Sequence, residues 1–273
     1  MSLTRLYSLT CVTLLAAPMA LAHEFWIEPT EFQVNSGAAI VADLRNGQLF
    51  KGSALSYFDK SNTRFEAAQG DETTPITGRM GDRPAIQLPA TGRDGLVILV
   101  HEAAPAVISY SEWEKFMKFV EHKDFAQAEA THISRGWAQE NFKETYSRHS
   151  KALVAVGTGA GADRAFGLTT EFVALDNPYA ADFDGTLDIE LLYDGAPRAN
   201  AQVEVYARDA QNAVTVTITR TNDQGHAAIP VVAGTEYLLD AVVLRPVTGA
   251  TTVEAGPVWE TLWASMTFAV PAR

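Results

Sequence analysis

Residues 201–243 read AQVEVYARDAQNAVTVTITRTNDQGHAAIPVVAGTEYLLDAVV, and this stretch holds the strongest evidence for the fold class. Apolar and polar residues alternate in its clearest run, Val214-Thr-Val-Thr-Ile-Thr219, with the period of two that is typical of a half-buried β-strand. Turn residues such as Asp223-Gln-Gly225 separate the runs. Several short strands at this spacing favour a β-sandwich.

The amino-terminal part of the chain also has the pattern of a β region. Leu96-Val-Ile-Leu-Val-His101 is almost continuously apolar, which is typical of a strand buried on both faces. Between the two β regions, Ser111 and Glu114 have the spacing of a capping box, and apolar residues follow at helical spacing. These features predict a helix over 111–127, and the polar stretch 128–150 is expected to be helical or irregular.

We therefore predict a mainly β protein with two β-sandwich domains of immunoglobulin-like or transthyretin-like type. The first domain is expected over residues 23–108 and the second over 152–273, with a helical insertion over 109–151 between them. The glycine run 157–161 has the spacing G-x-G-x-G, which does not match a dinucleotide-binding fingerprint. We interpret it as the connection between the domains.

Residues 1–22 have the features of a cleavable secretory signal peptide. Arg5 supplies a positive charge, an uncharged apolar run follows, and Ala20-Leu-Ala22 has the small residues that a signal peptidase cuts after. We therefore predict a periplasmic protein that begins at His23 and has no membrane span after cleavage. Cleavage also removes Cys11, so that the mature chain has no disulfide framework and no thiolate metal site.

The charge of the chain argues against polyanionic partners. It has 21 Lys and Arg against 33 Asp and Glu, a formal net charge of −12. An acidic surface repels phosphate backbones and anionic lipid headgroups, so we expect no nucleic-acid partner, whereas cations are suitable partners. The hydrolase motifs G-x-S-x-G, S-x-x-K and H-E-x-x-H are absent from the sequence, and we predict that the protein is not an enzyme.

A mature chain that begins with His23 has two nitrogen ligands on one residue. The free α-amine and the imidazole Nδ1 can close a chelate ring around a metal ion, and such ligands suit Cu(II) and Ni(II). One further His would complete the arrangement known as a histidine brace. The segment that follows His23 is amphipathic and apolar, so we expect the new amino terminus to be tied to the fold.

Two other histidines are candidates for completing this metal site. His101 ends the strongest strand of the first domain, and His149 lies at the edge of the next predicted strand. We rank His101 ahead of His149 as the second ligand. The remaining histidines fit ordinary positions: His122 on a solvated helix face, His132 in a polar stretch and His226 after a hairpin turn.

Four segments resemble those of a bacterial periplasmic family of unknown function that is often labelled a nickel uptake transporter component. They occur in the same order as in that family and together span nearly the whole mature chain. The resemblance rests on 22–29 (AHEFWIEP), 144–154 (ETYSRHSKALV), 174–179 (ALDNPY) and 259–268 (WETLWASMTF).

The resemblance implies a periplasmic protein with a carboxypeptidase-regulatory or transthyretin-like carboxy-terminal domain and a role in handling nickel or cobalt. His23 matches the His that follows the signal in the family, whereas Val243 stands where relatives often have a His in a late strand. We therefore expect a periplasmic binding protein for nickel, cobalt or copper that serves a membrane metal or TonB-type uptake system. The alternatives are a copper-dependent oxidative enzyme with a histidine brace and a metal-free interaction module of an outer-membrane uptake system.

Overall fold

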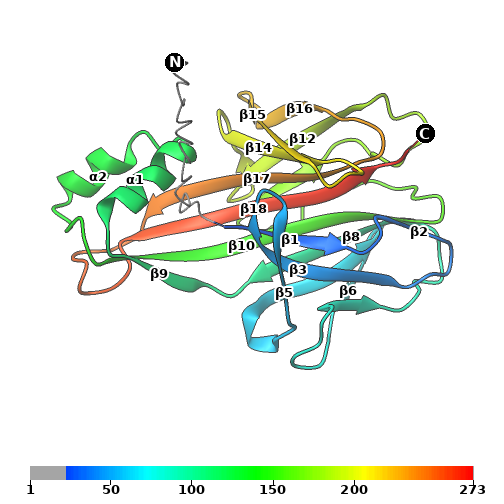
Figure 1. Cartoon of the computed structure of the whole chain (residues 1–273), viewed down its shortest axis with the longest axis horizontal. Helices are drawn as coiled ribbons and strands as arrows, with labels where there is room; N and C mark the ends of the chain where they lie inside the picture. Colours follow the sequence, from blue (N-terminus) through cyan, green and yellow to red (C-terminus); the bar gives the residue numbers. More distant parts are fainter. Residues whose placement is uncertain (1–22, 273) are drawn as a thin grey trace, which may run out of the picture.

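The computed structural model describes residues 23–272, which form three layers of β-sheet with a small helical layer at one end (Figure 1). The predicted signal peptide, residues 1–22 with Arg5 and Cys11, lies outside the described residues. The middle layer is a ten-stranded sheet with the order β15-β14-β17-β18-β10-β8-β5-β6, and β2 and β9 also pair with β10. The predicted mainly β fold with stacked sheets is therefore confirmed.

The middle sheet runs through the whole molecule. Its strands are β2 (Gln33–Val34), β5 (Asn62–Gln69), β6 (Glu72–Pro75), β8 (Gly95–Ala103), β9 (Ala106–Tyr110), β10 (Phe142–Val156), β14 (Gln202–Arg208), β15 (Val214–Arg220), β17 (Thr235–Pro246) and β18 (Trp259–Val270).

Two four-stranded sheets form the outer layers. The first contains β1 (Glu24–Pro29), β3 (Ile40–Gln48), β4 (Lys51–Leu55) and β7 (Ile86–Leu88). The second contains β11 (Thr170–Ala174), β12 (Thr186–Tyr193), β13 (Ala196–Pro197) and β16 (His226–Pro230). The helical elements are η1 (Asp59–Ser61), α1 (Trp113–His122) and α2 (Ala128–Ser134).

The two faces of strand β8 pack into two different hydrophobic cores. Val97 and Leu99 pack into the core beneath β1 and β3, whereas Leu96, Ile98 and Val100 pack into the core shared with β11 and β12. Both sets are buried, so a polar residue at any of these positions would be desolvated. The prediction that this nearly continuous apolar run is buried on both faces is confirmed.

Strand β10 lies at the centre of the middle sheet and corrects the expectation for 128–150. Only Ala128–Ser134 is helical, and a strand of 15 residues begins at Phe142. The prediction assumed that the polar residues of β10 are exposed. They are instead buried among hydrogen-bonding partners; Glu144, for example, is only 3% exposed. The predicted domain boundary between residues 151 and 152 falls inside this strand.

The first helix is shorter than predicted and begins differently. Glu112 is the N-cap residue of α1, and no side chain forms a capping hydrogen bond there. The predicted capping box of Ser111 and Glu114 is therefore wrong. The apolar stripe itself is confirmed as core packing. Phe116 and Val120 are buried in a cluster with Trp259, which ties the helical layer to the middle sheet.

The alternating run 214–219 lies in a strand at the edge of the middle sheet. This strand, β15, pairs only with β14 among the described strands. Val216 and Ile218 are nevertheless 41% and 60% exposed. The period of the sequence therefore predicted the strand correctly, whereas the burial of its apolar face depends on the layer that packs on it.

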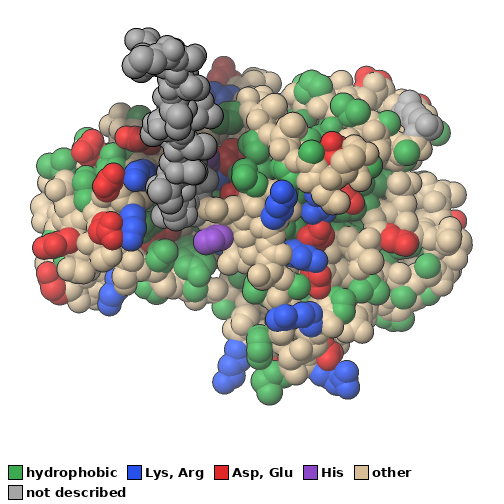
Figure 2. Space-filling model, in the orientation of Figure 1, with side chains coloured by type: hydrophobic (Ala, Val, Ile, Leu, Met, Phe, Trp, Pro, Cys, Tyr) green, Lys and Arg blue, Asp and Glu red, His purple; other side chains and the backbone are tan. Residues whose placement is uncertain are grey.

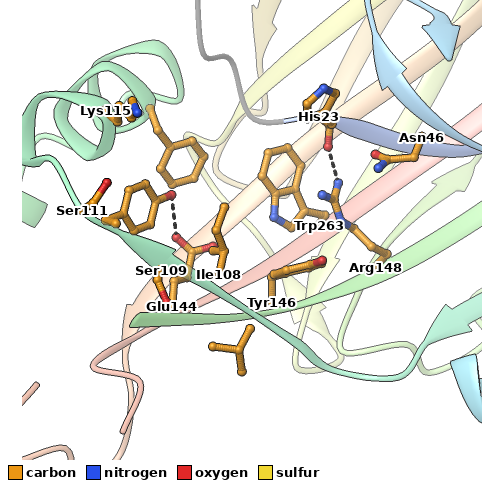
Figure 3. A pocket seen from close by; sticks show the side chains of 13 residues that line it. His23, Asn46, Ile108, Ser109, Ser111, Lys115, Glu144, Tyr146, Arg148 and Trp263 are labelled. Atoms are coloured by element: carbon orange, nitrogen blue, oxygen red, sulfur yellow. Dashed lines mark hydrogen bonds between the residues drawn. The ribbon is translucent and has the colours of Figure 1, made fainter. Parts of the chain in front are cut away.

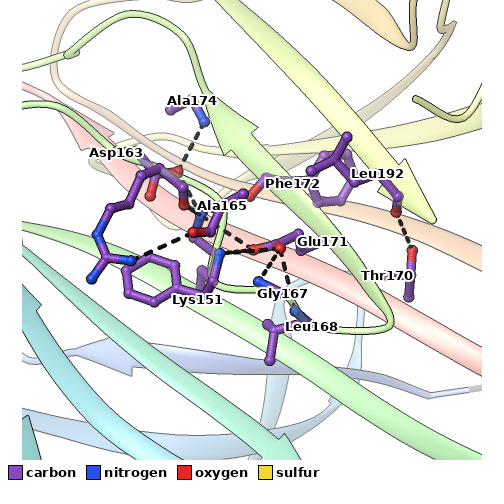
Figure 4. Close-up of polar contacts among 12 residues, drawn as sticks. Lys151, Asp163, Ala165, Gly167, Leu168, Thr170, Glu171, Phe172, Ala174 and Leu192 are labelled. Atoms are coloured by element: carbon purple, nitrogen blue, oxygen red, sulfur yellow. Dashed lines mark hydrogen bonds and ion pairs between the residues drawn. The ribbon is translucent and has the colours of Figure 1, made fainter. Parts of the chain in front are cut away.

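A buried ionic cluster holds the segment 157–169, which contains no helix or strand, against β10 (Figure 4). The Lys151 ammonium donates to Asp163 Oδ2 at 2.7 Å and to the carbonyl oxygens of Phe172 and Arg164 at 2.9 and 3.0 Å. Glu171, whose Oε2 lies 3.9 Å from this ammonium, accepts hydrogen bonds from three successive backbone N–H groups. The cluster therefore fixes the loop and β11 to the sheet.

The acidity of the chain is unevenly distributed over its surface. Figure 2 shows Asp and Glu side chains gathered over the helical end, whereas Lys and Arg side chains are more frequent over the middle and lower part of the same face. Among residues 23–272, no helix is long and apolar enough to cross a membrane.

Candidate ligand-binding site at the amino-terminal strand

His23, the residue after the predicted cleavage site, is exposed and directly precedes β1. Strand β1 pairs with β3 from its first residue, Glu24, onward. The guanidinium of Arg148, on β10, donates a hydrogen bond of 2.6 Å to the carbonyl oxygen of His23. The segment that begins at His23 is therefore held by strand pairing and by Arg148.

A cavity of about 430 Å³, here called the amino-terminal cavity, opens beside His23 (Figure 3). The Arg148 guanidinium carbon lies 4.4 Å from the ring centre of Trp263 and 5.3 Å from that of Tyr146, and both rings line the cavity. Lys115 of α1 lines its opposite side. The cavity thus lies between His23, β10 and the helical layer.

The acid in this cavity, Glu144, has a pKa raised to near neutrality. Burial raises the pKa of its carboxyl group to about 7. The carboxyl group accepts hydrogen bonds from the hydroxyls of Tyr110, at 3.0 Å, and Thr261. Glu144 is therefore not a permanent counter-ion for Arg148 or for a cationic ligand.

A buried charged cluster lies behind β1. Lys123 pairs with Glu204 at 3.0 Å and with Asp240 at 2.8 Å. The Tyr206 hydroxyl lies within hydrogen-bond distance of both Glu204 and Glu24, yet it has one proton to donate. Burial and the nearby Asp240 raise the pKa of Glu24 to about 7. A protonated Glu24 that donates to Tyr206, while Tyr206 donates to Glu204, satisfies all three groups.

His101 is buried among aromatic rings and has one free nitrogen. Its ring stacks on Phe25 at 5.2 Å and meets Phe65 edge-on at 4.9 Å. Asn62 donates its amide N–H to the carbonyl oxygen of Phe58, so that its Oδ1 faces His101 and accepts from Nε2 at 2.8 Å. Nδ1 then has an unshared lone pair and no partner among the described residues. Burial lowers the pKa of His101 to about 3, so the ring is neutral.

His149 is buried on the opposite face of the middle sheet from His101. Successive side chains of a strand alternate between faces, and the neighbouring Arg148 reaches toward β1. His149 Nδ1 lies 3.3 Å from the Trp263 carbonyl oxygen, and Nε2 lies 3.8 Å from Glu102, which also alternates with His101 on β8. Burial lowers the pKa of His149 to about 4.

The three predicted ligands therefore do not form one metal centre. The described residues contain no group of three or more His, Cys, Asp or Glu side chains that could hold a metal ion. His23 lines the amino-terminal cavity, whereas His101 lines a second cavity, and Arg148 borders both. The permanent positive charge of this guanidinium opposes a metal ion shared between His23 and His101. Of the three predicted ligands, only His23 is exposed.

Sequence reasoning missed two residues that organise this region, Glu24 and Arg148. Both lie in segments that carry the family resemblance, 22–29 and 144–154, and that was the available signal. Hydropathy could not identify them, because each is a charged residue within a strand. Their roles depend on partners that are distant in the sequence, such as Tyr206 for Glu24.

These features define a mainly β protein with ligand-sized cavities beside its amino-terminal strand. A family model described as "Domain of unknown function (DUF4198)" matches residues 20–245, and the chain belongs to this family. The resemblance inferred from the sequence is thus confirmed as a family of unknown function. No curated protein matches the chain.

Similar solved structures are distant. A tetra-tandem repeat in the extending region of a large adhesion protein is 12% identical, with 91% of this chain and 50% of that chain covered and a TM-score of 0.20. The BSP domain of a biofilm-associated protein is 11% identical (89% and 29% covered, TM-score 0.20). The D0-D1 domain of intimin is 10% identical (89% and 97% covered, TM-score 0.21). The chain spans about half or less of the first two, and at these TM-scores none carries a functional argument.

Proposed function

We propose that this protein is a periplasmic, non-enzymatic binding protein that captures a divalent transition metal, nickel, cobalt or copper, at its mature amino terminus. The observation that carries the proposal is the position of His23. It is exposed at a cavity, and pairing of β1 with β3 and the Arg148 hydrogen bond hold its backbone. Captured metal would pass to a membrane metal or TonB-type uptake system.

The ligand atoms in this proposal are the α-amine that signal cleavage creates and the imidazole Nδ1 of His23. Nitrogen donors of this kind suit Cu(II) and Ni(II), and the affinity order of divalent ions favours copper. No described residue hydrogen bonds to the His23 imidazole, so the ring is free to turn toward a ligand. Because Arg148 takes the carbonyl oxygen, the fold reduces the conformational entropy that binding would otherwise cost.

The geometry favours a binding protein over an oxidative enzyme. A histidine brace needs a second imidazole beside the first, and His23 is the one His among the described residues that line the amino-terminal cavity. His101 and His149 take no part in the proposal. The response of stability to metal distinguishes a metal-free interaction module from this proposal, because a metal that binds only the folded state must raise the stability of the protein.

The metal proposal predicts that one extra residue before His23 weakens metal binding at least tenfold. In such a variant the His23 nitrogen is a peptide amide, and the amine is displaced from the chelate. The mature protein should bind Cu(II) and Ni(II) in calorimetric titrations, and at 100 times Kd the metal should stabilise it by ~2.7 kcal/mol. Intact mass spectrometry establishes the amino terminus of each sample.

The matched control is His226→Ala, which removes an exposed His outside the cavity and should leave binding unchanged. Equal affinity of the extended and mature proteins would overturn the assignment to His23. A melting temperature that responds to neither metal would favour the metal-free interaction module.

A further inference from the structure

A second cavity, of about 570 Å³, shares Asn46, Tyr146 and Arg148 with the amino-terminal cavity but is not lined by His23; we call it the His101 cavity. It lies between the β3–β4 hairpin, η1 and the turn that joins β8 to β9. Its volume is in the range of pockets that hold small organic molecules.

All charged residues that line the His101 cavity are cations: Lys60, Arg83 and Arg148. No Asp or Glu lines it, although the chain has a net charge of −12. Within residues 23–272, none of the three cations has a carboxylate at salt-bridge distance. Such a cluster concentrates positive potential at one place on an acidic protein, which favours an anionic ligand.

Arg148 provides the most specific of these charges. It is half-buried against Trp263 and Tyr146, which restrict its orientation, and its one hydrogen bond goes to the His23 carbonyl oxygen. The planar guanidinium has five N–H donors, so donors remain for a ligand. Guanidinium groups bind carboxylates with two parallel hydrogen bonds.

His101 contributes a buried imidazole to the wall of the cavity. The side chain is 2% exposed, it lines the cavity, and its Nδ1 has no partner within the described chain. Because Asn62 fixes the proton on Nε2, Nδ1 can only accept. Nδ1 itself is not accessible to solvent, so the imidazole shapes the cavity wall and is not a direct contact for a ligand.

The rest of the lining is largely apolar. Phe25 and Leu44 contribute buried surface, and Leu55 and Phe58 are 36% and 46% exposed. Exposed large apolar side chains beside cations suit a ligand that has both an apolar body and a negative end.

We propose that the His101 cavity binds a small organic carboxylate with an apolar body. The carboxylate meets Arg148, with Lys60 and Arg83 adding attraction at the rim. This site adjoins the amino-terminal cavity, with which it shares Asn46, Tyr146 and Arg148, but it needs no metal at His23.

Calorimetric titration with 3-(4-hydroxyphenyl)propionate and with its neutral amide tests the proposal. The carboxylate should bind at a single saturable site, at least tenfold more tightly than the amide, and more weakly as salt is added. The Arg148→Gln variant should lose at least tenfold in affinity. The Lys60→Gln, Arg83→Gln double variant changes two exposed residues, so it should fold normally, bind several-fold more weakly and show a smaller salt dependence.

One control tests a general loss of surface charge, and two others separate this site from the metal site. Arg79→Gln removes an Arg whose side chain is 91% exposed and which does not line the cavity, and it should bind like the wild type. Binding should also persist in EDTA and in the variant with a residue added before His23. Failure of the carboxylate to bind, equal binding of the amide, or wild-type affinity of the folded Lys60, Arg83 double variant would each overturn the proposal.

Discussion

Replacing Lys151 by Met is expected to lower the free energy of unfolding by about 3–5 kcal/mol. The substitution removes the only cation within salt-bridge distance of Asp163 and Glu171 in the described chain, and both acids are buried. It also takes donors from the Phe172 and Arg164 carbonyl oxygens. Since a domain has a net stability of only about 5–15 kcal/mol, the loss is a large fraction of the total. Urea unfolding followed by circular dichroism measures it.

Lys115→Met is the matched control for this substitution. Lys115 also pairs with a carboxylate, Glu112 at 2.7 Å, but its side chain is 48% exposed, so the change should cost less than about 1 kcal/mol. Adding Asp163→Asn to Lys151→Met removes one stranded charge and should recover part of the stability. If Lys151→Met costs no more than Lys115→Met, the buried cluster does not hold the loop as described.

The β fold could be predicted from the sequence because its signals are local. The alternation in 214–219 and the apolar run 96–101 each fit within one strand, and both strands formed where expected. The local signals did not indicate which layer packs on each face of a strand. The exposed Ile218 and the doubly buried run of β8 differ in the layers packed on them, not in the period of their sequence.

Strand β10 shows why the middle of the chain was harder to predict. Its polarity is compensated by partners far away in the sequence: Glu144 accepts from Thr261, 117 residues later. Hydropathy treats Glu144 and Lys151 as solvent-facing residues, whereas the fold desolvates both and satisfies their hydrogen bonds. The polar sequence therefore predicted helical or irregular structure where a central strand lies.

Of the residues that line the amino-terminal cavity, only His23 was predicted from the sequence. The predicted cleavage site identified His23, and the structure places that residue at a cavity. Whether two histidines share a face depends on strand register, which the spacing of His101 and His149 does not reveal. Arg148 gains its importance from the fold, which brings its guanidinium to the His23 carbonyl oxygen between two cavities.

Replacing Glu24 by Gln is expected to flatten the dependence of stability on pH between pH 5 and 7. The folded pKa of Glu24, about 7, lies above the ordinary value of 4.5 for a Glu carboxyl group. Its contribution to stability is therefore fully present below pH 4.5 and is lost as the pH rises through 7. At ~1.36 kcal/mol per pKa unit, the wild type should lose roughly 2 kcal/mol through this group between pH 5 and 7. Gln cannot ionise, yet it can keep the hydrogen bond to Tyr206.

The wild-type profile alone cannot isolate this effect, because His101 and His149 act in the opposite direction. Their folded pKa values, about 3 and 4, lie below the ordinary imidazole value of 6.5, so their contribution is present above pH 6.5 and is lost as the pH falls. The comparison of urea unfolding for the wild type and Glu24→Gln cancels the histidine contributions. Glu129→Gln, which changes an exposed carboxyl of α2, should keep the wild-type slope. Parallel wild-type and Glu24→Gln profiles would mean that Glu24 ionises without cost, and that the protonated link from the amino-terminal strand to Tyr206 and Glu204 does not exist.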